Sequence, residues 1–302
     1  MPELYQRPKL ADLDLPLGKR VRLHRLLYQN GPGKGQLLVL PIDQGIEHGP
    51  VNFFVNPAAK HPRFQYELAK RGGFSAIAVH YGLASKYLHE YAGDVPLILK
   101  INGKTNIPSD DDALSRLTAT VDDAVRIGAD AIGYTLFVGS PRQDDDFQQL
   151  TDVRQSCERY GMPLIVWAYP RGSAINVKGG RDSFYAVDYA SRLAMELGAD
   201  IVKVNMPKFD PVNDKNAPAP YNTLQISLEE AFTQVVQSAG NAFVLVSGGS
   251  KLSDEDMLDK VRMSFKAGAT GLIFGRNMWQ RPMDEALEIT AKVKAIMAEF
   301  VD

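Results

Sequence analysis

The chain has 302 residues, 45% of them hydrophobic and 23% charged, which is the composition of an ordinary globular protein with a sizeable core. Its 34 basic and 36 acidic residues give a net charge of −2, and no basic patch of the kind that binds nucleic acid stands out. A single cysteine, Cys157, excludes an internal disulfide and favours a reducing compartment. The sequence has neither a signal-peptide core nor an apolar stretch of the roughly 18 residues that a membrane span needs, so we expect a cytoplasmic protein.

Eight short apolar runs recur along the chain, each followed by a loop marked by glycine or proline and then by a helical pattern. The runs are almost continuously apolar rather than alternating, which is typical of parallel strands buried on both faces. Several helical patterns end in Gly-Ala-Asp or Gly-Ala-Thr, where the glycine caps a helix before the next strand. The predicted strands cover residues 36–43, 74–80, 95–102, 131–137, 164–170, 200–206, 243–248 and 271–276.

This succession of eight strand–helix units predicts a (β/α)8 TIM barrel. An open doubly wound sheet is the alternative, but no G-x-G-x-x-G motif follows an early strand, and such sheets seldom hold eight evenly spaced units. We expect one TIM-barrel domain over residues 1–302, with an N-terminal helical extension at 1–35 closing the bottom, a barrel core at 36–280 and a C-terminal helix at 281–302. The irregular segment 206–222 is too long for an ordinary strand–helix loop and indicates a lid or a subunit contact.

The active site of such a barrel lies at the C-terminal ends of the strands, so polar residues there are the candidates. The clearest local signal is a pair of glycine-rich turns after the seventh and eighth strands, where barrels commonly hold a phosphate. Small residues let backbone N–H groups approach an anion, the positive end of a short helix adds attraction, and an arginine supplies a charge-assisted hydrogen bond. The predicted phosphate-binding residues are Ser247, Gly248, Gly249, Gly275 and Arg276.

A lysine, Lys203, lies inside the sixth predicted strand, where an uncompensated charge is costly. If its side chain faces the barrel interior, desolvation and nearby cations such as Arg276 and Lys100 lower its pKa and leave part of it as a free amine. Such an amine attacks a ketone to form a Schiff base, which suits a phosphorylated ketose. A structural ion pair between Lys203 and Asp43 is the alternative. Because "ILKIN" and "IVKVN" share one pattern, the spacing alone leaves open whether Lys100 or Lys203 is the nucleophile.

Six stretches resemble the archaeal-type class I fructose-1,6-bisphosphate aldolases, in the same order from about residue 36 to 280. They are "PIDQGIEHGP" (41–50), "LKINGKT" (99–105), "VWAYPRG" (166–172), "IVKVN" (201–205), "VSGG" (246–249) and "IFGRN" (273–277). The combination of the first and third stretches is highly specific. The resemblance implies a TIM barrel, a metal-independent Schiff-base mechanism with no cofactor, and a homo-oligomer, often a decamer of two stacked pentamers.

The resemblance also implies roles for individual residues. It places the covalent lysine on the sixth strand, at Lys203, the acid–base tyrosine at Tyr169 and the first strand's aspartate at Asp43. It matches the phosphate-binding loops to the two glycine-rich turns, and a second phosphate to Arg171. One departure is that the segment 206–222 is longer than in the compact archaeal members. The predicted substrate-binding residues are Trp167, Arg171 and Lys100.

We therefore expect a lyase, a class I fructose-bisphosphate aldolase that reversibly cleaves fructose 1,6-bisphosphate to dihydroxyacetone phosphate and glyceraldehyde 3-phosphate in glycolysis and gluconeogenesis. A related Schiff-base aldolase or thiolase that acts on another phosphorylated keto compound is one alternative, and a non-catalytic phosphosugar-binding barrel is another. No metal site is expected, because His80 and His89 lack an accompanying H-x-x-H or H-x-H motif.

Overall fold

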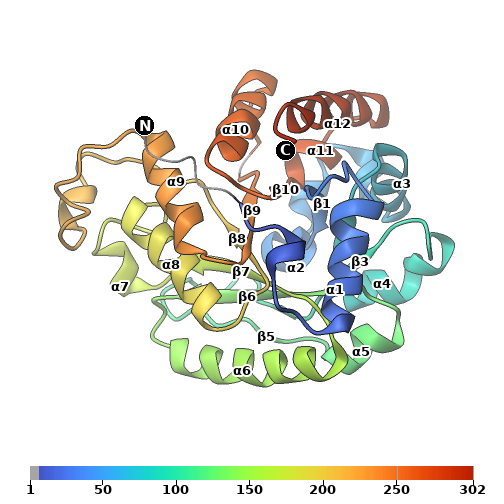
Figure 1. The fold of residues 1–302 in the computed structure, drawn as a ribbon, viewed down its shortest axis with the longest axis horizontal. Coiled ribbons are helices and arrows are strands. Elements are labelled where there is room, and N and C mark those ends of the chain that lie inside the picture. The colour runs from blue at the N-terminus through green and yellow to red at the C-terminus, as the bar shows by residue number, and fades with distance from the viewer. Residues whose placement is uncertain (1–6, 250, 302) are drawn as a thin grey trace.

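The computed structural model describes residues 7–249 and 251–301, which form a closed barrel of eight parallel strands. The barrel strands follow one another in chain order, and β1 pairs with β2 on one side and β10 on the other (Figure 1). Each coincides with an apolar run that predicted it, although β6 extends one residue beyond the run at 131–137, so the TIM barrel is confirmed. The barrel strands are β1 (Leu37–Ile42), β2 (Ala76–His80), β3 (Leu97–Lys100), β6 (Ala131–Val138), β7 (Leu164–Pro170), β8 (Ile201–Val204), β9 (Phe243–Ser247) and β10 (Gly271–Ile273).

Helices surround the barrel and alternate with its strands (Figure 1). The last helix packs against both α10 and α3, so it joins the end of the helical ring to its beginning. None of the described helices is long and apolar enough to cross a membrane. The helices are α1 (Leu17–His24), α2 (Gln44–His48), α3 (Arg63–Gly72), α4 (Tyr81–Tyr87), α5 (Val121–Arg126), α6 (Gln143–Tyr160), α7 (Ser173–Asn176), α8 (Phe184–Glu196), α9 (Leu228–Ser238), α10 (Asp254–Lys266), α11 (Arg276–Trp279) and α12 (Met283–Ala298).

Short elements fill several connections between these units. A one-turn π-helix, Arg25–Gln29, continues α1, and β4 (Asn102–Gly103) pairs with β5 (Arg116–Leu117) in a small antiparallel ladder after β3. The 3-10 helices are Leu10–Asp12, Pro50–Phe53, Pro57–Lys60, Leu88–Glu90 and Asp214–Asn216.

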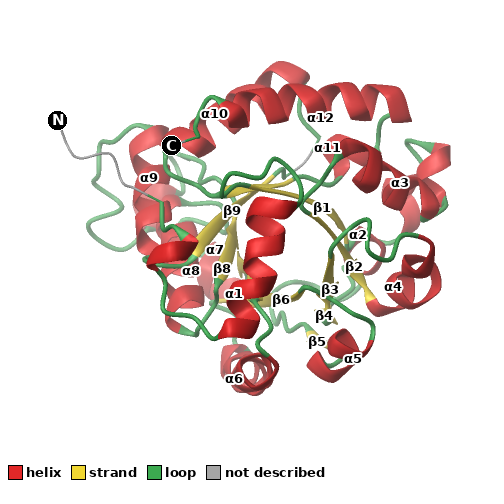
Figure 2. Cartoon of the chain, turned by 45° about the vertical axis from the view of Figure 1, so that its right-hand side comes forward, coloured by secondary structure: helices red, strands yellow, loops and turns green. Residues whose placement is uncertain are grey.

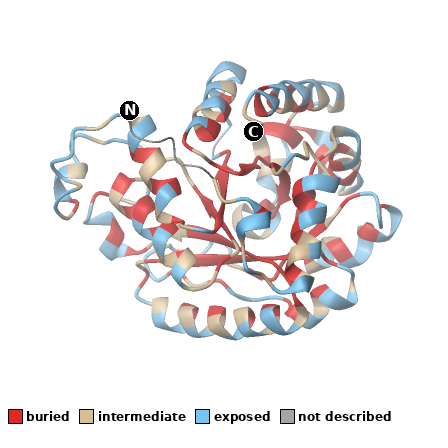
Figure 3. Cartoon of the chain, viewed as in Figure 1, coloured by how far each residue is buried: buried red, intermediate tan, exposed pale blue. Residues whose placement is uncertain are grey.

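The strands are buried on both faces, as their continuous apolar sequences predicted. In β1, Leu37 and Val39 belong to the cluster that fills the barrel interior, whereas Leu38 and Leu40 belong to the larger cluster between the sheet and the helices. Figure 3 shows the barrel strands as a buried band inside a ring of helices whose outer faces are exposed. The alternation within one strand therefore decides which side chains can reach the barrel axis.

The N-terminal helix α1 closes the bottom of the barrel, as the sequence predicted (Figure 2). Leu23 and the leucines that follow it join the cluster in the barrel interior. Lys19 is only 2% exposed, and its Nζ lies 2.5 Å from Glu158 Oε1 and 2.9 Å from Oδ2 of Asp200, just before β8. These contacts seal the N-terminal ends of the strands and leave the opposite end for the site.

The long segment after β8 folds against α8 instead of across the barrel end. The Tyr221 hydroxyl donates a 2.7 Å hydrogen bond to Asp188 in α8, and its ring packs on Phe184 with centroids 5.0 Å apart. Nearer the strand, Lys208 pairs with Asp182 at 3.0 Å. Of this segment, residues up to Lys208 reach the cavity described below, and the remainder covers the start of α8.

Candidate active site

A cavity of about 590 Å³ opens at the C-terminal end of the barrel, opposite α1. Its walls come from β1, β6, β7, β8, β9 and β10 and from the segments that follow the barrel strands. The sequence-predicted site residues that line it are Asp43, Tyr169, Arg171, Lys203, Ser247, Gly248, Gly249, Gly275 and Arg276.

Lys203 projects from β8 into the barrel interior and is 5% exposed. Its Nζ donates a hydrogen bond to the Tyr169 hydroxyl and lies 5.1 Å from the centre of the Trp167 ring. Burial lowers the pKa of Lys203 to about 8, with help from Lys100 and Arg276 and against the opposing charges of Asp43 and Glu47. A substantial fraction of free amine is therefore present near neutral pH.

Two carboxylates on the first strand–helix unit face this amine. Asp43 is 2% exposed, and its Oδ2 has no hydrogen-bond partner among the described residues. Burial raises the pKa of Asp43, but the charges of Lys203 and Lys100 outweigh it and bring the pKa below its ordinary value. No carboxylate of the described residues forms an ion pair with Lys203, so the structural ion pair that the sequence also allowed does not form. Burial and the adjacent Asp43 raise the pKa of Glu47.

Tyr169, near the end of β7, contacts the amine of Lys203 through its hydroxyl and the guanidinium of Arg171 through its ring. The guanidinium carbon of Arg171 lies 5.2 Å from the centre of the Tyr169 ring. Burial and the charges of Glu47 and Asp43 raise the pKa of Tyr169 well above its ordinary value, although Arg171 and Arg276 oppose them. The phenol is therefore neutral while Lys203 is an amine, and the two arginines alone do not lower its pKa to its ordinary value.

Lys100 and Trp167, which the sequence placed among the substrate-binding residues, lie beneath the cavity and do not line it. Both are fully buried. Lys100 Nζ donates hydrogen bonds of 2.7 Å to Thr135 Oγ1 and 3.1 Å to the Asn102 carbonyl, and lies 3.4 Å from Glu47 Oε1. Thus the side chain of Lys100 is held inside the barrel wall, one layer deeper than Lys203.

The two glycine turns meet at the other side of the cavity. A side chain on Gly275 would place its Cβ 2.9 Å from Pro41 O, and one on Gly248 would place it 2.9 Å from Asn277 Nδ2. Gly249 has a φ of +71°, which favours glycine. Arg276 donates a 2.8 Å hydrogen bond to the Gly249 carbonyl. Glycine backbone and the guanidinium of Arg276 thus lie together on this wall, an arrangement suited to a phosphate.

A family model described as DeoC/LacD family aldolase matches residues 37–281. The chain belongs to this aldolase family. It is 37% identical over 247 residues to a class 1 fructose-bisphosphate aldolase of Halobacterium salinarum, a match that covers 82% of this chain and 85% of the relative.

Two other members of the family bear on the chemistry of the site. A structure of an archaeal fructose-1,6-bisphosphate aldolase, with its catalytic lysine covalently bound to the carbinolamine intermediate, superposes with a TM-score of 0.76 at 34% identity, covering 93% of this chain and 98% of that one. A fructose-bisphosphate aldolase/6-deoxy-5-ketofructose 1-phosphate synthase of Methanocaldococcus jannaschii is 32% identical, covering 88% of this chain and 82% of the relative.

In this family member, the mouth of the cavity carries a charged cluster that sequence reasoning missed. Asp110, in the loop between β4 and β5, accepts from Lys104 at 3.1 Å and pairs with Arg171 Nε at 3.2 Å. Arg181 Nη1 lies 4.0 Å from the same carboxylate. Three cations from three loops thus converge on one aspartate. Lys104 and Asp110 lie far in the sequence from Arg171 and Arg181, and the four residues share no motif, so only Arg171 could be anticipated.

His80 and His89, the two histidines considered in the sequence, lie apart in different surroundings. His80 is buried with neither ring nitrogen hydrogen-bonded to a described residue, and burial lowers its pKa to about 4. His89 is exposed and lies 3.9 Å from Glu90. The described residues contain no group of three or more His, Cys, Asp or Glu that could hold a metal ion.

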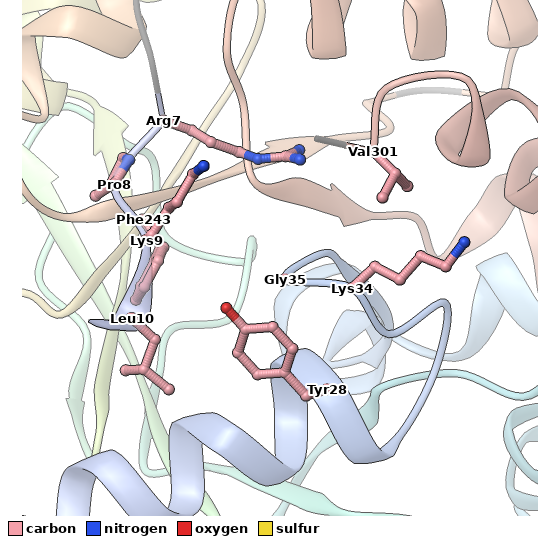
Figure 4. A pocket seen from close by; sticks show the side chains of 9 residues that line it. All are labelled: Arg7, Pro8, Lys9, Leu10, Tyr28, Lys34, Gly35, Phe243 and Val301. Atoms are coloured by element: carbon pink, nitrogen blue, oxygen red, sulfur yellow. The ribbon is translucent and has the colours of Figure 1, made fainter. Parts of the chain in front are cut away.

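A separate cavity of about 440 Å³ lies at the α1 end of the barrel (Figure 4). It includes Phe243, the first residue of β9, and none of the predicted site residues. Its lining is Arg7, Pro8, Lys9, Leu10, Tyr28, Lys34, Gly35, Phe243 and Val301.

Proposed function

We propose that the chain is a class I fructose-bisphosphate aldolase that cleaves fructose 1,6-bisphosphate reversibly to dihydroxyacetone phosphate and glyceraldehyde 3-phosphate. The observation that supports this most directly is the buried amine of Lys203, with its lowered pKa, bonded to the Tyr169 hydroxyl inside one cavity. Its relatives supply the substrate class, since they are named as fructose-bisphosphate aldolases.

The first half of the reaction belongs to Lys203. Its uncharged amine attacks the C2 carbonyl, and loss of water from the resulting carbinolamine gives an iminium. The positive nitrogen then withdraws electrons from the C3–C4 bond. Asp43, buried and facing the amine, keeps its negative charge and stabilises the iminium that forms.

The second half needs a base at the C4 hydroxyl, and Tyr169 is the candidate. Its phenol is neutral beside an amine. When the carbinolamine loses water, this phenol donates its proton to the hydroxyl that leaves C2. The iminium formed on Lys203 then lies within hydrogen-bond distance and stabilises the phenolate by lowering the pKa of Tyr169, and the phenolate accepts the proton of the C4 hydroxyl. Cleavage of the C3–C4 bond releases glyceraldehyde 3-phosphate and leaves an enamine, which is protonated and hydrolysed to dihydroxyacetone phosphate.

A bisphosphate also suits the distribution of charge in the cavity. The turns at Ser247–Gly249 and Gly275–Arg276 would take the phosphate on C1, and Arg171 at the mouth would take the second one. Lys203 lies in the same cavity as both of these regions. A sugar with a phosphate at each end therefore presents its middle to the amine.

The test is reductive trapping with sodium borohydride and dihydroxyacetone phosphate, read by mass spectrometry of the peptides. A covalent adduct on Lys203 is expected, and Lys203→Met should abolish it. Absence of any adduct would overturn the proposal, and an adduct on Lys100 would reassign the nucleophile. Cleavage should survive EDTA; loss of activity that zinc restores would overturn the metal-independent mechanism.

A related aldolase that acts on another phosphorylated keto compound is the second candidate, because the relative from Methanocaldococcus jannaschii carries two activities in its name. Both candidates predict the adduct on Lys203. The comparison of cleavage rates for fructose 1,6-bisphosphate and fructose 1-phosphate separates them, since the proposed enzyme should prefer the bisphosphate.

We further propose that the chain works as a cytoplasmic homo-oligomer, such as a decamer, that binds neither nucleic acid nor membranes. One domain over residues 1–302 would then hold the extension at 1–35, the barrel core at 36–280 and the final helix at 281–302. Multi-angle light scattering on the purified protein tests the assembly, and a monomeric mass would refute it.

A further inference from the structure

A lysine on the outer ring of helices, Lys260 in α10, reaches into the phosphate side of the cavity. Its Nζ lies 3.5 Å from the Gly248 carbonyl oxygen and 3.9 Å from where a Cβ on Gly249 would stand. It lines the same cavity as Ser247 and Arg276. The amine thus stands beside one of the two glycine turns that the proposed function assigns to a phosphate.

Lys260 differs from the neighbouring cations in its partners. Lys208, which also faces the cavity, pairs with Asp182 at 3.0 Å, and Arg276 is bonded to the Gly249 carbonyl. Lys260 forms no ion pair with any carboxylate among the described residues, and the one hydrogen bond recorded for its amine goes to the Gly248 carbonyl. A partly buried cation without a counter-charge is unfavourable, and an anion that binds beside it relieves this cost.

Burial and the charged groups that face Lys260 determine its protonation state. Burial, together with the charge of Lys208, lowers its pKa to about 8, while Asp182 opposes both. Arg276, on α11, adds a further positive charge to the same wall. The site is therefore cationic overall but incompletely protonated at neutral to mildly basic pH.

We propose that Lys260 binds the substrate phosphate at the glycine turns and takes up a proton from solvent as the phosphate binds. This inference rests on the proposed function, because it supplies a further residue for the same phosphate site. A phosphate dianion next to the amine favours its charged form, so the bound state holds Lys260 as an ammonium. Binding is then linked to protons: the affinity for phosphate esters falls as the pH rises through about 8.

The size of the linkage follows from the pKa. With the pKa of Lys260 at about 8, about half of the molecules carry the neutral amine at pH 8, so binding takes up about half a proton. At pH 6.5 nearly all are already protonated, and the uptake by this group should vanish. Loss of the charge should weaken binding by about ten- to a hundredfold, the range expected for one hydrogen bond to a charged group.

The test is titration calorimetry with sn-glycerol 3-phosphate, a phosphate monoester that has no carbonyl and so forms no imine with Lys203. Titrations at pH 8 in two buffers of different ionisation enthalpy give the number of protons taken up. The unsubstituted protein should take up about half a proton per site, as the pKa of about 8 requires. Lys260→Met should weaken binding and abolish the uptake.

Lys260→Arg separates charge from titration, because its guanidinium stays protonated. This variant should keep most of the affinity but lose the proton uptake. Lys203→Met is the control and should retain the uptake, whereas Lys208→Met should reduce the uptake at pH 8, because it removes a positive charge that lowers the pKa of Lys260. Unchanged affinity and uptake in Lys260→Met, or uptake that disappears with Lys203→Met, would overturn the proposal. Adduct formation on Lys203 of the unsubstituted protein tests the proposed function separately.

Discussion

Replacing Lys100 with methionine should raise the pKa of Lys203 and slow imine formation at neutral pH. Lys100 is fully buried and does not line the cavity, so the substitution leaves the substrate's surroundings in place. What it removes is a positive charge that disfavours the protonated form of Lys203. Without that charge the ammonium form is easier to hold, so the titration moves to higher pH.

The size of this pKa shift follows from the distance between the two amines, which both lie near the ring of Trp167. The Nζ atoms of Lys100 and Lys203 lie 5.3 and 5.1 Å from the centre of the Trp167 ring, so they are at most about 10 Å apart. At an effective dielectric constant of about 20, two unit charges at that distance repel by about 1.7 kcal/mol, so removing the charge of Lys100 raises the pKa of Lys203 by roughly one. With a starting pKa of about 8, the free amine at pH 7 falls from about one molecule in ten to about one in a hundred.

The assay is the initial rate of adduct formation with dihydroxyacetone phosphate and cyanoborohydride, followed by mass spectrometry between pH 6 and pH 10. The midpoint of the rate should move up by roughly one pH unit in Lys100→Met, and the adduct should stay on Lys203. Thr135→Val is the matched control, since it removes the 2.7 Å hydrogen bond to Lys100 but keeps the charge. Its midpoint should not move.

Glu47 could mask the effect by protonating when its cation is removed, because burial already raises its pKa. The comparison is therefore repeated in a Glu47→Gln background, where this compensation is absent. The Glu47→Gln single variant should have a lower pH midpoint of adduct formation than the unsubstituted protein, and adding Lys100→Met to it should raise this midpoint again. A midpoint that stays fixed in both backgrounds would refute the electrostatic argument, and loss of the adduct with Lys100→Met would refute the choice of nucleophile.

Three further substitutions test other parts of the structure. Tyr169→Phe should slow cleavage of fructose 1,6-bisphosphate by at least about a hundredfold but leave the trapped adduct, and loss of the adduct would contradict the assigned role. Lys19→Met should lower the free energy of unfolding in urea by about 3 kcal/mol, because Asp200 stays buried without its cation. Adding Asp200→Asn should restore part of the lost stability, and additive losses from the two substitutions would contradict the pairing. Asp110→Asn should lower the KM for fructose 1,6-bisphosphate severalfold but not that for fructose 1-phosphate, because it frees Arg171 for the second phosphate; equal changes would contradict that subsite.

The barrel and the phosphate turns could be predicted because their causes are local. A strand buried on both faces must be apolar throughout, and the run at 36–43 shows this without knowledge of its neighbours. A turn whose backbone has a positive φ favours glycine, as at Gly249, whose φ is +71°. Each of these constraints acts on a few consecutive residues, and the sequence therefore displays it.

The rest of the site could not be predicted because it depends on which loops meet. Lys104, Asp110 and Arg181 look like ordinary surface charges in the sequence, and only the closure of the barrel brings them around Arg171. Lys260 lies in a helix whose other charges are mostly exposed, and its position beside Gly248 depends on how α10 packs. Charge clusters assembled from separate loops leave no periodic or spaced signal.

The two lysine–asparagine patterns show how the same local sequence acquires different chemistry. "ILKIN" and "IVKVN" place Lys100 and Lys203 in equivalent settings on β3 and β8. Lys100 has its hydrogen bonds taken up by Thr135, the Asn102 carbonyl and Glu47, so its amine is held in place beneath the cavity. Lys203 has the Tyr169 hydroxyl, no carboxylate partner among the described residues, and a face on the cavity. An amine can act as a nucleophile only where it is both partly deprotonated and accessible, and the neighbouring strands meet both conditions at Lys203.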